Sequence, residues 1–313
     1  MRLRNSALLP LFALACSAES TPSTEAADAT ADTTSIVDDV QAGTDSDDDT
    51  GPADDLTQPD TADTGPEAPI PTYTWERLAV DPPSRSVHAM AYLPWTKRTI
   101  AFSGNHGSGP SDDFWSYDGA AWTQLPRAEG DCPVRKNAGI AVDAVHETVY
   151  LFAGVWSGYR PSGSYEVDIL GDFCSFDGTA WTLLPFASGP SPRAGHAMAF
   201  DATRDRLVVF GGLTDGEKRL DDTWLYDGTT WSQPTLTQPS PPPRLNAKMV
   251  FDPDRKLILL FGGHAADPEG ELVMLDDTWE WDGSEWTEVA TKHKPPGRGF
   301  YGMAYDTAER RVL

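Results

Sequence analysis

Short apolar runs recur through the second part of the chain at intervals of about fifty residues, separated by polar and glycine-rich segments. The clearest runs are residues 207–210 and 257–261, and two glycines follow each of them. Runs that are apolar at every position predict strands buried on both faces, as in sheets that stack against neighbouring sheets. The period predicts a repeat architecture, either a propeller or a solenoid.

Four strands are predicted in each repeat. The first follows a proline and an arginine and is rich in small residues, which suits the crowded position nearest a central axis. The second is the apolar run, and the third carries an aromatic residue after an acidic start. An Asp-Gly turn then leads to a Trp that opens the fourth strand. The arginines are Arg85, Arg135, Arg193, Arg244 and Arg298, and the closing tryptophans are Trp122, Trp181, Trp231 and Trp286.

This register resembles the kelch repeat, which has a glycine doublet after strand two, an aromatic residue in strand three and a Trp in strand four. The resemblance covers residues 73–313 and implies an all-β fold, a β-propeller of four-stranded antiparallel blades. The turn before the closing Trp is two residues shorter than in typical kelch repeats. The second repeat departs further, because Ala153 precedes the glycine after strand two and Cys174 replaces the usual Trp.

The ends of the repeat region, which we take as residues 71–313, are irregular. Trp75 begins a segment that matches the outer-strand motif although no blade precedes it, so we expect it to close the ring by completing the last blade. At Leu313 the sequence is two residues into a predicted second strand, after four complete repeats and a partial fifth. Propellers close with four to eight blades and kelch-like ones usually with six or seven, so the expectation is an incomplete propeller.

The segment before the repeats has two parts. Residues 1–16 combine a basic start with a short apolar run, which is typical of an export signal. Residues 13–16 resemble a bacterial lipobox, which implies lipidation of Cys16; an ordinary secretory signal is the alternative. The hypothesis for localisation is therefore extracytoplasmic, with a lipid anchor on the bacterial outer membrane or cell surface, or else secreted or periplasmic.

Residues 17–70 are predicted to be a disordered acidic linker. They contain fifteen acidic residues and neither Lys nor Arg, so they cannot bury enough apolar surface to offset the entropy of ordering. The run that starts at Asp45 invites a calcium-loop interpretation, but Gly51 is its seventh residue and Leu56 its twelfth. An EF-hand loop needs Gly at position six and an acid at position twelve.

The net charge of −24 argues against nucleic acid as a partner. Residues 71–313 carry −11, which lacks the basic surface of a nucleic-acid-binding protein. If Cys16 is lipidated, Cys132 and Cys174 remain as a pair in an oxidising compartment, and a disulfide between them is a candidate pairing.

Candidate ligand-binding residues lie in the connections between strands two and three, where the repeats diverge. The longest of these spans residues 155–171 and holds aromatic and arginine side chains, which are favoured at binding hot spots. The alternative is that these are ordinary surface residues without a binding role. The candidate residues are Trp156, Tyr159, Arg160, Tyr165, His106 and His264.

We interpret the polar residues that recur with the repeat as structural residues. We expect the repeated arginines to pair with acidic residues at the start of strand three, Arg193 with Asp221 or Asp222 for example, rather than to form a ring that binds a ligand. His88 and His196 share one register in strand one and are interpreted as packed core residues rather than metal ligands.

Three functions remain open at this point. The first is a non-enzymatic binding propeller, without metal or cofactor, whose loops on one face hold a protein or carbohydrate and whose only membrane contact is the N-terminal lipid. The second is a copper radical oxidase of the galactose oxidase type; that resemblance implies a Tyr-Cys cross-link and two His ligands, for which the sequence shows no recognisable spacing. The third is a purely structural part of the cell envelope.

Overall fold

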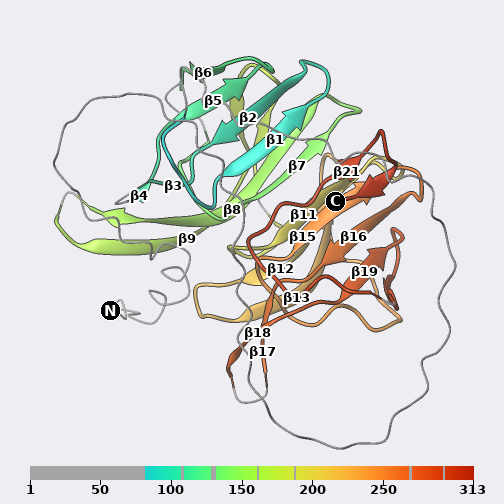
Figure 1. Ribbon diagram of the computed structural model, residues 1–313. Coiled ribbons are helices and arrows are strands. Elements are labelled where there is room, and N and C mark those ends of the chain that lie inside the picture. Colours follow the sequence, from blue (N-terminus) through green and yellow to red (C-terminus); the bar gives the residue numbers. More distant parts are fainter. Residues whose placement is uncertain are drawn as a thin grey trace, which may run out of the picture. The chain divides into compact units, whose positions relative to one another are not determined.

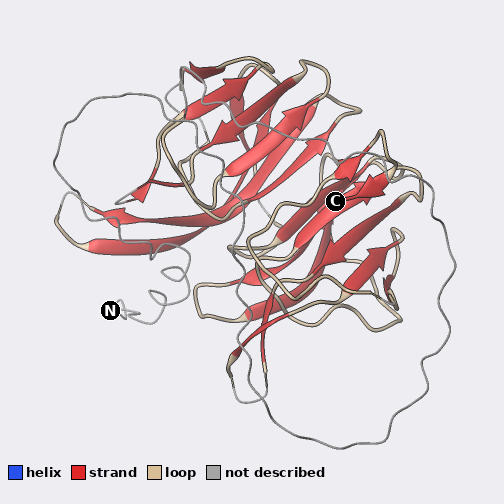
Figure 2. Cartoon of the chain, in the orientation of Figure 1, coloured by secondary structure: helices blue, strands red, loops and turns tan. Residues whose placement is uncertain are grey.

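The computed structural model describes residues 82–106, 109–127, 132–160, 162–186, 188–267, 270–291 and 293–313. In this part of the chain every regular element is a strand, and four antiparallel four-stranded sheets form the blades of a β-propeller (Figures 1 and 2). Among these residues no helix has the length and apolar character needed to span a membrane. The predicted signal, Cys16, the acidic linker and Trp75 lie outside the described residues.

The strands of each blade follow chain order from the axis outward. Blade one consists of β1 (Ala89–Leu93), β2 (Arg98–Phe102), β5 (Phe114–Tyr117) and β6 (Trp122–Leu125). Blade two consists of β7 (Gly139–Asp143), β8 (Thr148–Tyr159), β9 (Tyr165–Phe176) and β10 (Trp181–Leu184). Blade three consists of β11 (Ala197–Asp201), β12 (Arg206–Leu213), β13 (Arg219–Tyr226) and β14 (Trp231–Ser232). Blade four consists of β15 (Lys248–Asp252), β16 (Leu257–Phe261), β19 (Thr278–Trp281) and β20 (Trp286–Glu288). A fifth sheet begins with β21 (Tyr305–Asp306) and β22 (Arg311–Val312).

The small-residue strands are innermost, as predicted, because β1, β7, β11 and β15 contact one another in turn (Figure 1). A short ribbon continues from the second and third strands of every blade on one face of the propeller, which we call the loop face. Blades one and four have separate ribbons, β3 (Asn105–His106) with β4 (Gly109–Pro110) and β17 (His264–Ala266) with β18 (Leu272–Met274). In blades two and three the same strands run on past a bulge.

The closing tryptophans of blades two, three and four contact the blade before each of them. The ring of Trp181 lies 4.9 Å from that of Phe102 in blade one, and the ring of Trp286 lies 5.3 Å from that of Phe210 in blade three. The indole N–H of Trp286 also donates to Thr223 Oγ1 at 2.9 Å. Because these rings complete the apolar clusters between successive sheets, the repeat period of the sequence is the period of blade-to-blade packing.

A buried arginine organises the loop-face end of each blade. Arg193 is 0% exposed; it donates to both carboxylate oxygens of Asp222, at 2.7 and 2.9 Å, and to the carbonyl of Gly211 at 2.9 Å. Asp222 also accepts a hydrogen bond from the indole of Trp224 at 2.7 Å. Equivalent ion pairs join Arg85 to Asp113, Arg135 to Asp172, and Arg244 to Asp277.

The same arginine connects its blade to the previous one through its backbone. The amide of Gly154 donates to the carbonyl of Arg193 at 2.8 Å, and the amide of Gly212 donates to that of Arg244 at 2.8 Å. Gly211 has a φ of 68°, and a Cβ there would lie 2.7 Å from the carbonyl oxygen of Arg244, which leads into the next blade. The glycine after strand two therefore permits both a left-handed backbone and close contact between blades.

Three carboxylates of this network, those of Asp113, Asp222 and Asp277, have a lowered pKa. Burial by itself raises the pKa of Asp113, but hydrogen bonds from Arg85, Trp115 and Ser111 outweigh it and lower the pKa to about 2. Burial also raises the pKa of Asp222 and of Asp277. The paired arginine and the indole donor lower it by more, so both pKa values lie below the ordinary value. The carboxylates of Asp113, Asp222 and Asp277 are therefore ionised at neutral pH.

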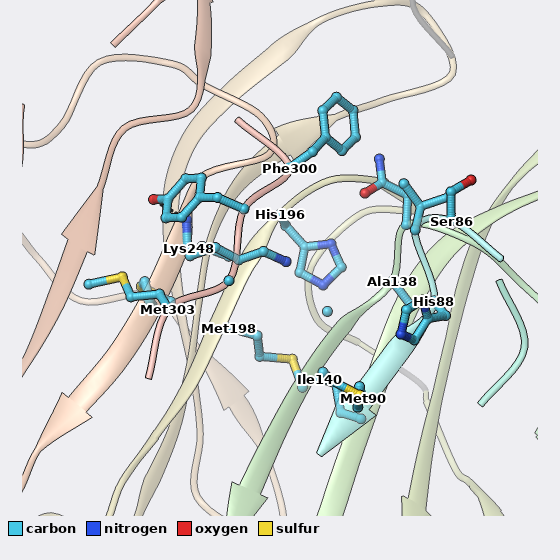
Figure 3. A pocket seen from close by; sticks show the side chains of 17 residues that line it. Ser86, His88, Met90, Ala138, Ile140, His196, Met198, Lys248, Phe300 and Met303 are labelled. Atoms are coloured by element: carbon cyan, nitrogen blue, oxygen red, sulfur yellow. Dashed lines mark hydrogen bonds between the residues drawn. The ribbon is translucent and has the colours of Figure 1, made fainter. Parts of the chain in front are cut away.

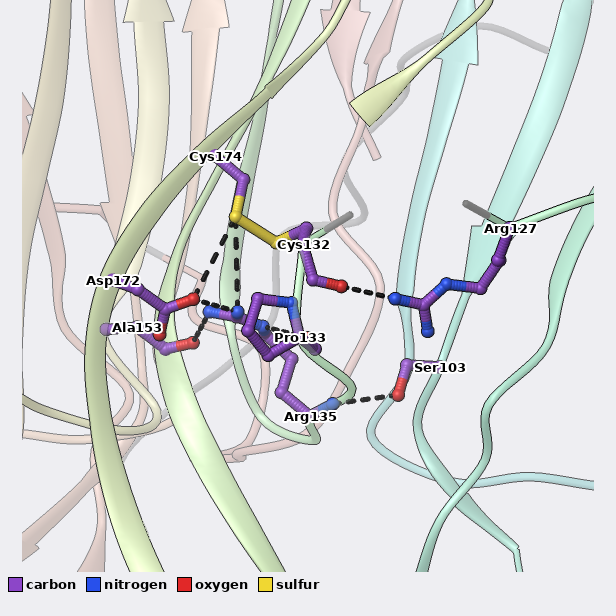
Figure 4. Close-up of a disulfide and its surroundings, with 8 residues drawn as sticks. All are labelled: Ser103, Arg127, Cys132, Pro133, Arg135, Ala153, Asp172 and Cys174. Atoms are coloured by element: carbon purple, nitrogen blue, oxygen red, sulfur yellow. Dashed lines mark hydrogen bonds and ion pairs between the residues drawn. A yellow bond between two sulfur atoms is a disulfide. The ribbon is translucent and has the colours of Figure 1, made fainter. Parts of the chain in front are cut away.

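Blade two replaces one part of this network with a disulfide between Cys132 and Cys174 (Figure 4). Cys174 stands where the other blades have the Trp that donates to the paired Asp. Cys132 stands three residues before the arginine, where the other repeats have proline. Both cysteines are fully buried, and Arg135 and Asp172 lie beside the sulfur of Cys174.

Candidate functional site

The most extended feature of the loop face is the outer half of the β8–β9 hairpin, which we call the β8–β9 ribbon (residues 155–169). The sequence predicted a loop over residues 155–171. That prediction was wrong, because β8 and β9 continue to pair as far as Tyr159 opposite Tyr165. The ladder shifts register between Phe152 and Gly154, and such a bulge changes the direction of a strand without ending it. The candidate residues therefore sit on a paired, ordered element.

Four residues form a self-contained cluster on the ribbon. Arg160 Cζ lies 3.9 Å from the centre of the Trp156 ring, within the range of a cation–π contact. Arg160 Nε lies 3.1 Å from a carboxylate oxygen of Glu166, and Nη2 pairs with Asp168. The charge of Arg160 is therefore already compensated, and this candidate residue supports the ribbon rather than offering a free cation to a ligand.

Tyr159 and Tyr165 form an exposed aromatic pair near the tip of the ribbon. They lie directly opposite each other across the ladder, with ring centres 5.2 Å apart, and are 67% and 43% exposed. Side chains alternate along a strand, so the pair shares its face with Val167 rather than with Trp156. Val167 packs against Leu213 and Leu245 of blades three and four. The inner part of this face is thus anchored, and its outer part presents two tyrosine rings to solvent.

The two histidine candidates are not equivalent. His106 is exposed on β3, and its Nδ1 lies 2.8 Å from the carbonyl of Ser84. His264 is only 4% exposed; its ring lies 5.4 Å from that of Phe300, and burial lowers its pKa. The segment around Phe300 covers His264 at the start of β17, and its role as a ligand contact stays a prediction.

Two groups of potential metal ligands occur in the described residues. The first contains Cys132 and Cys174, whose sulfurs are bonded to each other and so are not available as thiolates or for a Tyr-Cys cross-link. The second is on the opposite face, where His146 Nδ1 lies 2.8 Å from Asp143 and 3.5 Å from Asp205. A hydrogen bond with Asp143, followed by the charge of that carboxylate, raises the pKa of His146. His146 thus links two blades, as Arg204 does through Asp201 and the carbonyl of Lys256.

A cavity of about 610 Å³ lies between the innermost strands (Figure 3). Its lining comes from equivalent positions of successive repeats, one to five residues after each arginine. The lining includes His88, Met90, Ile140, His196, Met198, Lys248, Met249, Tyr301 and Met303. The recurrence of His88 and His196 in one register was visible in the sequence, but the cavity and Lys248 were not predicted.

The two histidines are packed residues, and they also line this cavity. A Cβ on Gly139 would lie 2.2 Å from Nε2 of His196, so a side chain at position 139 would force the imidazole to move. Burial, with smaller effects from Arg193 and Lys248, holds the pKa of His196 well below its ordinary value. Burial, then Arg85 and Lys248, also lowers the pKa of His88. Both imidazoles are therefore neutral at pH 7.

Comparisons with known proteins agree with this architecture. Residues 155–309 match the family model described as the KLHDC2/KLHL20/DRC7 Kelch-repeats domain. The solved structure titled "Structure of YjhT" superimposes with a TM-score of 0.56 at 15% identity, covering 75% of this chain and 78% of that one. The blades, their order around the axis and these matches define a β-propeller. Residues 155–309 are therefore a kelch-repeat region within this propeller.

The curated relatives that match are much longer than the shared region. Dynein regulatory complex subunit 7 of Chlamydomonas reinhardtii is 40% identical over 130 residues, which is 41% of this chain and 11% of that protein. F-box/kelch-repeat protein At1g51550 of Arabidopsis thaliana is 31% identical over 138 residues, which is 40% of this chain and 27% of that protein. The chain thus spans between about a tenth and about a quarter of these two relatives.

Proposed function

We propose that this chain is a non-enzymatic binding propeller that holds a protein partner at its loop face, with Tyr159 and Tyr165 as the central contacts. The observation that carries the proposal is the exposed tyrosine pair on a paired, anchored ribbon. Tyrosine is enriched among the residues that contribute most to protein binding. A tyrosine on a rigid ribbon loses little conformational entropy when it is buried by a partner.

Two further observations favour a protein ligand over a catalytic role. The Trp156 and Arg160 cluster is internally satisfied, so it stiffens the ribbon without providing a reactive group. One matching relative is by name a subunit of a regulatory complex. A rigid ribbon that projects from a repeat scaffold suits a surface that binds another macromolecule.

Replacing both tyrosines by serine is expected to weaken partner binding at least tenfold, since two buried aromatic contacts would be lost. Proteins of the source organism that bind the immobilised chain would be identified, purified and titrated against the Tyr159→Ser/Tyr165→Ser variant. Tyr92→Ser is a matched control, because Tyr92 is also exposed but lies on β1. Unchanged affinity of the double variant would contradict the proposal, and binding to a glycan array alone would replace the protein partner with a carbohydrate.

We also propose that the propeller is displayed outside the cytoplasm through a lipid on Cys16. A disulfide between Cys132 and Cys174 supports an oxidising compartment, and the sequence of residues 1–16 supports export. Mass spectrometry of the mature protein is expected to find an N-terminal diacylated Cys16, and Cys16→Ser is expected to move the protein from the membrane fraction to the soluble fraction. An unlipidated N-terminus with unchanged fractionation would contradict the anchor.

A further inference from the structure

The cavity between the innermost strands differs in charge from the rest of the molecule. Residues 71–313 carry a net charge of −11, yet none of the described residues that line the cavity is Asp or Glu. Its one formal charge is the ammonium group of Lys248. Lys248 is an exposed residue of β15, and within the described part of the chain no carboxylate forms an ion pair with it; partial desolvation lowers its pKa. The cavity is therefore a cationic space in an acidic protein.

Polar groups without partners face the same space. His196 is 5% exposed, and neither of its ring nitrogens has a hydrogen-bond partner among the described residues. Nδ1 of His88 also has no partner in this part of the chain. A neutral imidazole has one N–H donor, and a buried donor without a partner destabilises the fold. Figure 3 shows the amine of Lys248 and the ring of His196 directed into the cavity, with His88 on another wall.

Apolar side chains complete the lining. Met90, Met198, Met249 and Met303 occupy one register of four repeats, and Phe300 closes one side. Methionine adapts to irregular apolar shapes. A volume of about 610 Å³ lies within the range of small-molecule sites. The lining thus offers one cation, imidazole donors and an apolar wall, which together match an anionic group attached to an apolar body.

We propose that this cavity is a binding site for a small organic anion, whose charged group pairs with Lys248 and accepts a hydrogen bond from His196, while its apolar body contacts the methionines. The site is separate from the loop-face ribbon, so it does not depend on the proposed protein partner. A carboxylate there satisfies the buried donor and the unpaired ammonium group together.

Benzoate is a suitable probe because benzamide and benzylammonium have the same ring with a neutral or a cationic group. In the full chain labelled with ¹³C at the methionine methyl groups, benzoate is expected to shift the signals of the four cavity methionines. Met274 is an internal control, since it is exposed on β18 and does not line the cavity. Benzamide is expected to bind at least tenfold more weakly, and benzylammonium not measurably. Equal affinity for benzoate and benzamide, equal shifts at Met274, or no shifts at all would overturn the site.

Substitution of the cation provides a second test. Lys248→Leu is expected to weaken benzoate binding at least tenfold by calorimetry, whereas Lys248→Arg retains it, because only the first variant removes the charge. Lys218→Leu is a matched control, since Lys218 is an exposed lysine at the tip of the blade-three ribbon. Benzoate affinity that is unchanged in a folded Lys248→Leu protein would overturn the role of Lys248. If that variant does not fold, the selectivity of the wild-type methionine shifts decides the proposal.

Discussion

Replacing Arg193 by Met is expected to lower the free energy of unfolding by about 3–5 kcal/mol at pH 7, because it leaves a carboxylate without its buried partner. Arg193 is fully buried, donates twice to Asp222 and once to the carbonyl of Gly211, and so joins the first three strands of blade three. Methionine keeps much of the side-chain volume, so most of the loss reflects the uncompensated charge of Asp222. Chemical denaturation of the variant and the wild type measures the difference.

Two comparisons distinguish this origin from a general packing defect. Arg298→Met occupies the same repeat register, but Arg298 is exposed and hydrogen-bonds through Nε to the carbonyl of Pro296, so its expected loss is below about 1 kcal/mol. The penalty in Arg193→Met should also shrink as the pH falls towards 4. Burial alone raises the pKa of Asp222, and the variant lacks the arginine that lowers it, so its carboxyl protonates more readily and becomes neutral. A loss that is independent of pH, or equal at Arg298, would contradict the ion-pair explanation.

The repeat register of the sequence was sufficient to predict the blades and the ion pairs, because both depend on contacts that recur with the period. Arg193 and Trp224 stand at fixed distances from the apolar run, and residues of the same parity share a face of strand three. That parity selects Asp222 over Asp221, since Asp222 lies two residues before Trp224 and accepts its indole hydrogen bond. The choice between the two acids was thus accessible from alternation, although both were left open.

The parts that were not predicted depend on features outside the repeat. The ribbon over residues 155–169 has two strand-like runs around Pro-Ser-Gly-Ser, a hairpin signal that its interpretation as a divergent loop overlooked. His264 is buried by a segment more than thirty residues further along the chain, which local pattern does not reveal. The axial cavity needs Lys248, His196 and His88 from three blades, and their meeting follows only from how the inner strands surround the axis.

Removal of the disulfide between Cys132 and Cys174 is expected to destabilise the fold strongly. Cys132 and Cys174 are 42 residues apart, and a cross-link over that length stabilises a folded chain by about 4 kcal/mol in the chain-entropy model, within a usual range of about 2–5 kcal/mol. Cys132→Ser/Cys174→Ser is therefore expected to lower the free energy of unfolding by about 2–5 kcal/mol. Reduction of the wild type with dithiothreitol should give a similar loss, measured by denaturant unfolding with and without the reductant.

The other blades suggest how to restore part of that stability without sulfur. They have proline where Cys132 stands and tryptophan where Cys174 stands, and in those blades the indole donates to the paired aspartate, as Trp224 does to Asp222. Cys132→Pro/Cys174→Trp should recover about 1.5–3 kcal/mol over the double serine variant through burial of the indole, with Asp172 as its acceptor. Its unfolding should be insensitive to dithiothreitol. If the Pro and Trp variant is no more stable than the serine variant, the disulfide does not substitute for the Trp-Asp contact, and blade two packs its outer strands by a different rule.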